Sequence, residues 1–291
     1  MNTGYNLIFI SLKREIMKKL LCSLAGVACL GAGVASANTL DQIKSSKVLR
    51  IGVSEHMAPF SVLQSDGSFV GFEIDFAKEI AKAILGDEGR IEFVGVPQKE
   101  RLDYVKDNKV DLLIAAYTRN EKRAQVVDFS VPYFSINLST VSKRTAGIKS
   151  IEDLEGKRIA VIGESNSDVW VRKNPNITPV PCQNNKDCYD KVNRGEADAY
   201  MHNIVSVASV PVLDLNFEVS IPKIGETFFD CVVTQKGNKD ILQLVDQKIF
   251  ELSQAGYFDK KYDETIGPFY NGNVPKHYFL LDDLYNQFLT M

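Results

Sequence analysis

Residues 118–133 read TRNEKRAQVVDFSVPY, and this stretch decides how the rest of the chain is interpreted. The apolar run before it, residues 110–117, is typical of a buried strand. Another strand-like stretch ends it, so we expect the basic segment to be a loop leaving a sheet edge. Thr118 and Arg123 on this loop predict a carboxylate-binding fork, because a guanidinium offers paired N–H donors to two oxygens. A solvated basic loop is the alternative, since Arg is mostly exposed.

Length and composition limit the number of domains and the class of protein. A chain of 291 residues suggests about two domains. With 45% hydrophobic and 24% charged residues and a net charge of −3, the composition is that of a soluble globular protein. A nucleic-acid-binding protein would usually carry a basic surplus, and none is present.

The N-terminus has the pattern of a secretory signal. Lys18 and Lys19 precede the apolar residues 20–34, and a small-residue exit ends at Ala37. The apolar run is shorter than the ~20 residues that a membrane span needs. We therefore expect export with cleavage after Ala37, which leaves a periplasmic protein.

Two details of this leader leave alternatives open. Met17 is a plausible true start, which would make residues 1–16 an upstream extension. A lipid anchor on Cys29 is the alternative to cleavage after Ala37. Gly26 argues against it, because that position calls for a Leu-like residue.

Three cysteines follow the leader. Export places them in an oxidising compartment, and Cys182 and Cys188 enclose five polar residues, so a local disulfide is reasonable. Cys231 lies in the apolar run 228–233 and reads as a buried thiol. The whole chain has three His, so a zinc ligand set is not expected, and neither is any cofactor.

Strand-like and helix-like patterns alternate along the first half. Residues 72–85 repeat apolar positions at spacings of three and four, which predicts an amphipathic helix. The expected order is β-α-β-α-β, which builds a parallel sheet with helices on its faces. Its segments are strand 48–54, a hairpin over 61–71, helix 72–85, strand 91–96, helix 100–108 and strand 110–117.

The same pattern then restarts. A strand at 158–163 precedes a capping-box pattern at Ser165 that begins a helix. We interpret the Pro-rich residues 175–181 as a connection to the next helix. The remaining segments are helix 186–194, strand 197–203 and a last helix at 239–255. Beyond Pro268 the chain becomes irregular and rich in aromatic residues, which favours packing over a partner surface.

Several short motifs together resemble one family. They are Gly52 with Ala58-Pro59-Phe60, Gly71-Phe72-Glu73-Ile74-Asp75, Lys109-Val110-Asp111, Arg123 with Phe129-Ser130-Val131-Pro132-Tyr133, and Gly195-Glu196-Ala197-Asp198-Ala199. In this order, behind a secretory signal, they resemble the periplasmic solute-binding proteins of the polar amino-acid type, family 3, which serve ABC importers. The resemblance covers roughly residues 40–267.

The resemblance implies an α/β fold of two Rossmann-like lobes joined by two hinge strands, the periplasmic-binding-protein type II fold. The ligand would lie between the lobes. The hinge crossings would fall near residues 136–141 and 228–233. Lobe one would then be 38–137 plus 234–267, lobe two 138–233, with the signal at 1–37 and a C-terminal extension at 268–291.

The resemblance also assigns ligand-binding roles. Arg123 would bind the α-carboxylate of an amino acid, supported by the hydroxyl and backbone N–H of Thr118. Where the family usually has Thr, Pro and Glu, this chain has Asn120, Glu121 and Lys122, which predicts a less rigid loop. Ser165 and Asn166 match the lobe-two positions that donate to the same carboxylate, with plain helix capping as the alternative.

The largest departure from the family is Asn203, where an Asp commonly pairs with the ligand's α-ammonium. A neutral amide makes a weaker bond, by about 1–2 kcal/mol. Either another carboxylate, Glu55 or Asp230, takes this role, or the ligand has no primary ammonium. Surface positions for Glu55 and Asp230 are the alternative.

Three further positions bear on selectivity. Binders of cationic amino acids often have an acid near Ser54 and an aromatic residue near Met57, and this chain has neither. Arg101 stands where binders of acidic and polar amino acids often place an inward Arg. Pairing with Asp103 or Glu100 on a helix surface is the alternative. We therefore expect an acidic or polar ligand rather than a cationic one.

The expected function is a non-enzymatic, monomeric binding protein that closes on an amino-acid-like ligand and docks on an inner-membrane permease. A periplasmic dehydratase of the prephenate or arogenate type would use the same scaffold. It would need an acid beside Asn203, where Ile204, Val205 and Ser206 follow instead. A surface adhesin or sensor on the same fold is the other alternative.

Overall fold

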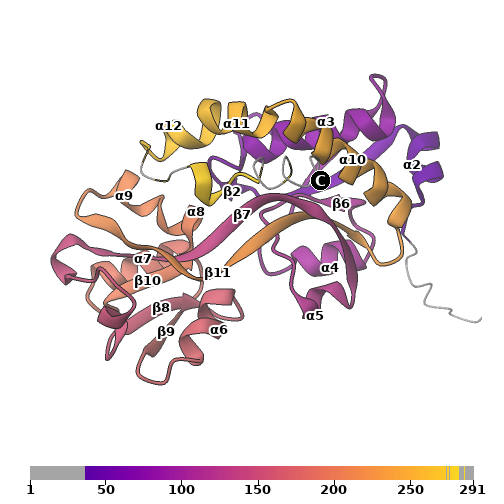
Figure 1. The fold of residues 1–291 in the computed structure, drawn as a ribbon. Helices are drawn as coiled ribbons and strands as arrows, with labels where there is room; N and C mark the ends of the chain where they lie inside the picture. The colour runs from indigo at the N-terminus through magenta and orange to yellow at the C-terminus, as the bar shows by residue number, and fades with distance from the viewer. Residues whose placement is uncertain (1–36, 273, 275, 282–284, 286–291) are drawn as a thin grey trace, which may run out of the picture. The chain divides into compact units, whose positions relative to one another are not determined.

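A computed structural model describes residues 37–272, 274, 276–281 and 285 (Figure 1). The predicted signal lies outside the described residues, except for its last position, Ala37. The proposed start at Met17 and the alternative lipid site at Cys29 also lie outside them. Among the described helices, none has the length and apolar character to cross a membrane.

The described residues form two sheets flanked by helices. The larger sheet has eight strands in the order β5-β1-β6-β11-β7-β10-β8-β9, and β2-β3-β4 form the smaller. The strands are β1 (Val48–Val53), β2 (His56–Met57), β3 (Ser61–Leu63), β4 (Phe69–Val70), β5 (Arg90–Gly95), β6 (Leu112–Leu113), β7 (Val127–Lys143), β8 (Arg158–Ile162), β9 (Thr178–Cys182), β10 (Ala199–Asn203) and β11 (Phe217–Gln235). The α-helices are α2 (Leu40–Ser46), α3 (Phe72–Leu85), α4 (Arg101–Lys106), α5 (Glu121–Ala124), α6 (Asn166–Arg172), α7 (Asn185–Asn193), α8 (Ile204–Val207), α9 (Val210–Leu213), α10 (Lys239–Gln254), α11 (Tyr257–Lys261) and α12 (Gly267–Phe269).

The first α/β unit contains the predicted parallel sheet. Strand β1 pairs in parallel with β5 on one side and β6 on the other. Helix α3 forms over the predicted residues, and the apolar face that its spacing gives is buried at Phe72, Phe76 and Ile80. Its N-cap, Gly71, has φ +135°, and a Cβ there would lie 2.3 Å from the carbonyl oxygen of Phe60. Only glycine fits this approach.

The second unit repeats the arrangement with one difference from the prediction. Strand β8 pairs in parallel with β9 and β10, and α6 and α7 lie in the connections. The Pro-rich residues predicted as a connection contain strand β9. That interpretation was wrong because β9 is the last strand of the sheet, and an edge strand tolerates residues such as Pro179 and Pro181.

Two long antiparallel strands connect the units. Strands β7 and β11 pair from Val127 to Lys143 and contain both predicted crossings, 136–141 and 228–233. Strand β11 pairs with β6 of the first unit, and β7 pairs with β10 of the second. Figure 1 shows both strands running from one unit into the other. We call the unit with β1, β5 and β6 the first lobe and the unit with β8, β9 and β10 the second lobe.

Two of the three described cysteines form a disulfide, and the third is a free thiol. Cys182 at the end of β9 and Cys188 in α7 form a disulfide with a Cα–Cα distance of 5.3 Å. Cys231 is a buried free thiol, and burial raises its pKa to about 12, with a further contribution from Asp230.

The C-terminal segment packs against β7 and reaches the second lobe. The Phe279 ring stacks on Phe134 with centroids 4.9 Å apart, and the Phe279 carbonyl accepts a hydrogen bond of 2.8 Å from the Ser135 N–H. The Tyr270 hydroxyl donates to the Val205 carbonyl in α8 at 2.8 Å. Tyr270 and Phe279 therefore serve packing, as the aromatic pattern of this segment favoured.

Candidate ligand-binding site

The Thr118–Arg123 fork forms at the exit from β6. Arg123 Nη1 donates to the carbonyl oxygen of Thr118 at 2.7 Å and to its Oγ1 at 2.8 Å. Asn120 Oδ1 accepts from the Arg123 N–H at 2.8 Å and so caps α5. Asn is a strong N-cap residue, and Asn120 caps the turn that carries Arg123. The less rigid loop that the sequence predicted here stays a prediction. No carboxylate of the described residues pairs with this guanidinium.

Arg101 lies beside this fork rather than on a helix surface. Its Nη1 donates to the Ala115 carbonyl at 2.7 Å, and its Nε donates to the Gln98 carbonyl at 3.0 Å. The alternative of pairing with Asp103 or Glu100 is not what the structure shows. Both guanidinium groups lie over the Tyr117 ring, Arg123 at 4.2 Å and Arg101 at 5.0 Å from its centroid. Burial lowers the pKa of Arg101, and the charge of Arg123 lowers it further.

Two buried carboxylates lie close to these cations. Glu73 is fully buried; its Oε1 accepts from the Ala116 N–H at 2.7 Å and from the Tyr133 hydroxyl. Asp230 is 1% exposed, and neither of its oxygens has a hydrogen-bond partner among the described residues. Burial raises the pKa of both carboxyl groups, and the charge of Glu73 raises that of Asp230 further.

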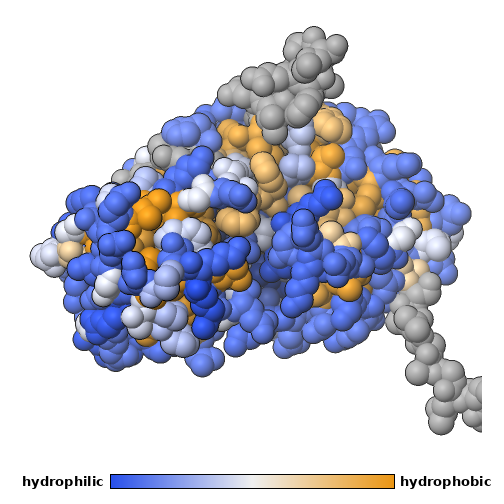
Figure 2. Space-filling model, turned by 60° about the horizontal axis from the view of Figure 1, so that its bottom comes forward, coloured by the Kyte–Doolittle hydropathy of each residue, from blue (hydrophilic) through white to orange (hydrophobic). Residues whose placement is uncertain are grey.

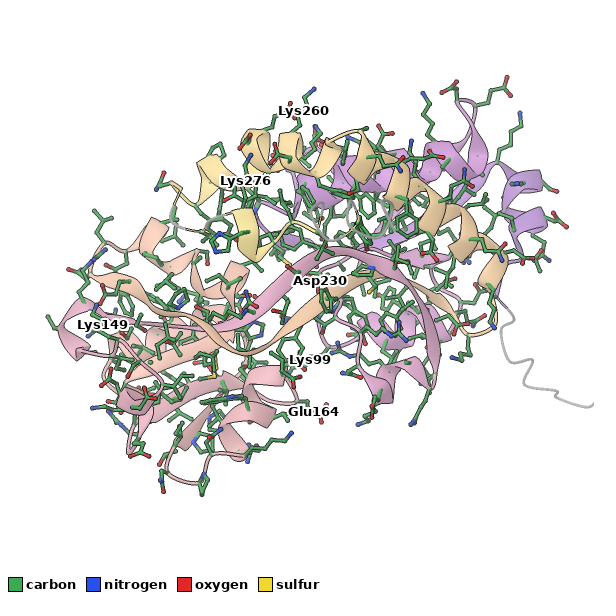
Figure 3. All side chains as sticks on the ribbon, viewed as in Figure 1. Lys99, Lys149, Glu164, Asp230, Lys260 and Lys276 are labelled. Carbon is green, nitrogen blue, oxygen red and sulfur yellow. A yellow bond between two sulfur atoms is a disulfide. The ribbon has the colours of Figure 1, made fainter. Side chains whose placement is uncertain are left out.

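Backbone geometry also marks this region. The predicted strand 110–117 pairs only at Leu112–Leu113, after which Ala116 adopts φ +45°. The left-handed region is uncommon for Ala, and such residues cluster at binding sites. The turn brings Thr118 into an antiparallel bridge with Asp230. Figure 3 places Asp230 where β7 and β11 run together between the lobes.

The second-lobe candidates use their side chains for helix capping. Ser165 Oγ accepts from the Asp168 N–H at 3.2 Å at the start of α6, whose first residue is Asn166. Asn203 Oδ1 accepts from the Ser206 N–H at 2.9 Å and caps α8. The capping alternative is thus present in the structure, and ligand contact by these residues remains a prediction.

The remaining candidates lie near the β2–β3 hairpin. Ser54 is buried, and its carbonyl accepts from the Ser61 hydroxyl at 2.5 Å. Met57 is half-buried and packs against the core of the first lobe. The Glu55 side chain is 44% exposed and lies beside His56, so it has the surface character of the alternative reading. Among the described residues, no hydrogen bond or ion pair joins Ser54, Glu55 or Met57 to Arg123.

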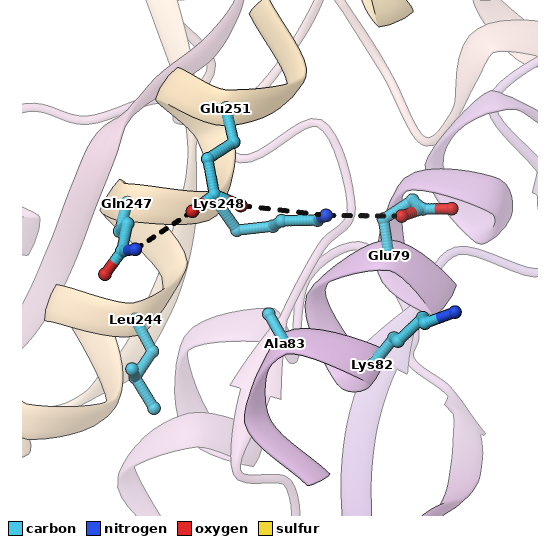
Figure 4. A pocket seen from close by; sticks show the side chains of 7 residues that line it. All are labelled: Glu79, Lys82, Ala83, Leu244, Gln247, Lys248 and Glu251. Atoms are coloured by element: carbon cyan, nitrogen blue, oxygen red, sulfur yellow. Dashed lines mark hydrogen bonds and ion pairs between the residues drawn. The ribbon is translucent and has the colours of Figure 1, made fainter. Parts of the chain in front are cut away.

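A groove elsewhere on the first lobe is a poorer candidate. It lies between α3 and α10 and is lined by Glu79, Lys82, Ala83, Leu244, Gln247, Lys248 and Glu251 (Figure 4). Its charges compensate one another, since Lys248 pairs with Glu79 at 3.5 Å and with Glu251 at 3.9 Å. By contrast, Figure 2 shows the largely hydrophilic face hollowed between the two lobes.

The sequence profile of the bacterial extracellular solute-binding proteins, family 3, matches residues 49–268. The chain belongs to this family. Among its relatives is the ABC transporter glutamine-binding protein GlnH of Bacillus subtilis, 28% identical over 87% of this chain and 97% of that protein. The L-cysteine solute receptor of Neisseria gonorrhoeae is 30% identical with a TM-score of 0.74, covering 83% of this chain and 99% of the other. The cysteine-binding protein of Campylobacter jejuni is 30% identical with a TM-score of 0.75, covering 84% and 98%.

Family membership confirms the predicted two-lobe α/β fold. Sequence motifs identified some residues of the site and missed others. The family-like motifs pointed to Arg123 and Thr118. They missed His202 in β10, which is 8% exposed with no partner for Nδ1 among the described atoms. Burial lowers its pKa to about 4, and the charge of Arg101 contributes to the shift. The signal that could have found it was its position, because His202 directly precedes Asn203 in the sequence.

Proposed function

We propose that this protein is the substrate-binding component of an ABC importer and closes on a small amino acid. The observation that carries the proposal is the fork of Thr118 and Arg123, whose guanidinium has no carboxylate partner within the described chain. A ligand α-carboxylate would accept paired N–H bonds there. The relatives named above, which are a glutamine-binding protein and two cysteine-binding proteins, support an amino acid as the ligand.

Closure would follow from the long strands. We place the hinge at residues 136–141 of β7 and 228–233 of β11, which divides the chain into the lobes 38–137 plus 234–267 and 138–233. A ligand that contacts both lobes stabilises the closed form because it binds that form better. The closed form would then dock as a monomer on a permease of the inner membrane. A cleaved signal ending at Ala37 would deliver the protein to the periplasm.

The charges of the site favour an acidic or polar ligand. Two guanidinium groups, Arg101 and Arg123, lie near two carboxyl groups, Glu73 and Asp230. A zwitterionic amino acid with a neutral side chain adds no net charge to this set. A cationic side chain would need an additional acid, and neither Ser54 nor Met57 supplies one. The dehydratase alternative gains no support at Asn203, because Ile204 and Val205 begin a buried apolar turn of α8.

Isothermal titration with L-glutamine, L-cysteine, L-glutamate and L-arginine tests the proposal. We expect at least one of the first three to bind, and Arg123→Ala to weaken that binding by about a hundredfold or more. The matched control is Arg119→Ala, which removes the same charge from an exposed neighbour on the same loop. Equal affinity of Arg123→Ala and the wild type would contradict the assignment of the fork.

A further inference from the structure

Asp230 faces the same side of the sheet as the carboxylate fork. It lies directly opposite Thr118 in an antiparallel bridge, flanked by hydrogen bonds from Cys231 N–H to the Tyr117 carbonyl at 3.2 Å and from Arg119 N–H to the Phe229 carbonyl at 3.1 Å. Side chains of directly opposed residues project to the same face, with Cβ atoms about 5 Å apart. The Asp230 carboxyl group therefore lies beside the Thr118 hydroxyl that accepts a hydrogen bond from Arg123.

This carboxyl group is unsatisfied. It is 1% exposed, and both oxygens lack a hydrogen-bond partner within the part of the chain that the structure describes. A buried carboxylate without partners is costly, and one kept in a native structure calls for an explanation. The charged and titratable groups that act on it are Glu73, Arg101 and Arg123, with Tyr133 on β7 and Cys231 next to it on β11.

The family position for an ammonium partner cannot take this role in full. Asn203 is neutral, and its Oδ1 is already an acceptor for the Ser206 N–H at 2.9 Å. A charged ammonium is held best by an ionised acceptor, since charge-assisted bonds are roughly twice as strong as neutral ones. The unsatisfied carboxyl group of Asp230, in β11 on the other side of β7, can carry the charge that Asn203 lacks.

We propose that Asp230 is the counter-ion of the ligand's α-ammonium, so that the site selects zwitterionic α-amino acids over the corresponding des-amino carboxylates. The inference rests on the proposed function, because it takes the α-carboxylate to lie on the fork. In an α-amino acid, the carboxylate and the ammonium group are bonded to the same carbon, Cα. A carboxylate between Arg123 and Thr118 therefore directs the ammonium toward the residue opposite Thr118.

The position of Asp230 predicts that ligand binding changes its protonation state. Burial and the charge of Glu73 raise the pKa of Asp230, while Arg101 and Arg123 act in the opposite direction. An arriving ammonium stabilises the ionised form of Asp230. Binding is therefore linked to proton release, and affinity increases as pH rises through the pKa of the free Asp230.

The test compares each amino acid with the same molecule lacking its amino group, by isothermal titration at pH 7.5. The probes are L-glutamine with glutaramate and L-cysteine with 3-mercaptopropionate. For the wild type we expect a preference for the amino acid of about tenfold to a hundredfold. Asp230→Asn should lose most of this preference, with the affinity for the des-amino probe changed by less than about threefold.

Two further variants keep the test decisive. Asp230→Glu retains the charge and should keep a preference. Asp246→Asn removes a half-buried carboxylate of α10 that accepts from the Val131 N–H, and it should leave the preference unchanged. An unchanged preference in Asp230→Asn overturns the inference, as does an equal loss of affinity for both members of a pair. Absence of binding of L-glutamine, L-cysteine and L-glutamate to the wild type would overturn the proposed function as well.

Discussion

The two lobes contribute to the site in different ways. On the first-lobe side, Arg123, Arg101 and Asp230 are ionisable groups that are at least half-buried and that lack an ion-pair partner within the described residues. Asp230 lies in the hinge segment of β11, and we group it with the first lobe because it pairs with Thr118. In the second lobe, Ser165 and Asn203 are neutral, and each side chain already accepts a backbone hydrogen bond at the start of a short helix.

The difference indicates a division of labour. The first lobe holds fixed charges whose compensation awaits a ligand, whereas the second lobe is largely satisfied by itself. We infer that the first lobe recognises the charges of the amino acid and the second lobe covers it with neutral groups. Four changes, ordered by expected effect, break or sharpen this comparison.

The largest loss of affinity is expected when Arg123 keeps its positive charge but loses the planar guanidinium group. Arg123→Lys retains the positive charge, yet an ammonium cannot form the paired, planar contact with a carboxylate. We expect the affinity for the best amino acid to fall about ten- to a hundredfold in isothermal titration. Lys122→Arg, on the exposed position beside it, serves as the control. Full affinity in Arg123→Lys would mean that the fork acts only as a point charge.

The second effect concerns stability and its pH dependence. Because the pKa of Asp230 is raised by burial and by Glu73, its contribution to stability is fully present below the unfolded-state pKa of about 3.9. That contribution is lost as pH rises through the folded-state pKa. Asp230→Asn should therefore raise the free energy of unfolding near pH 7 by about 1–3 kcal/mol, measured by urea denaturation without ligand.

The matched measurement is the same denaturation series near pH 4. There the variant and the wild type should differ much less, because Asp230 is protonated in the folded state and about half-protonated in the unfolded state. A variant that is less stable than the wild type near pH 7 would show that Asp230 makes a contact that stabilises the unliganded fold.

These two predictions rest on features that can be predicted from the sequence to different degrees. The Arg123 fork rests on residues five apart in one loop, so motif and residue chemistry identified it. The helix Phe72–Leu85 was equally accessible, because its apolar spacing is local. Such features depend on neighbours along the chain, which a sequence displays directly.

Other features depend on contacts that the sequence does not display. The burial of Asp230 results from its bridge to Thr118, a partner more than a hundred residues away. Sequence could name Asp230 as a candidate but could not separate it from the exposed Glu55. Strand β9 was missed because its prolines indicate a connection unless the strand is known to lie at the sheet edge.

A smaller effect is expected in the second lobe at Ser165. Ser165→Ala removes the cap of α6 and should lower the free energy of unfolding by about 1 kcal/mol, measured by urea denaturation. Since we assign the ligand's charges to the first lobe, affinity should change by less than about threefold. A loss of tenfold or more with the expected small change in stability would assign Ser165 to the ligand.

The smallest effect is expected at Asn203. Asn203→Asp restores the residue that the family commonly has, and Asp caps a helix as well as Asn does. If Asp230 already holds the ammonium, affinity in isothermal titration should change by less than about threefold. A tenfold or greater gain in affinity would show that the second lobe binds the ligand's α-ammonium.

A crystal structure of the complex with the tightest-binding amino acid tests the central claim most directly, through the distances from the α-ammonium nitrogen. We predict a carboxyl oxygen of Asp230 at about 2.7–3.2 Å from that nitrogen, with the ligand carboxylate on Arg123 and Thr118. An ammonium held instead by Asn203, with Asp230 still lacking a partner, would contradict the assignment of both ligand charges to the first lobe.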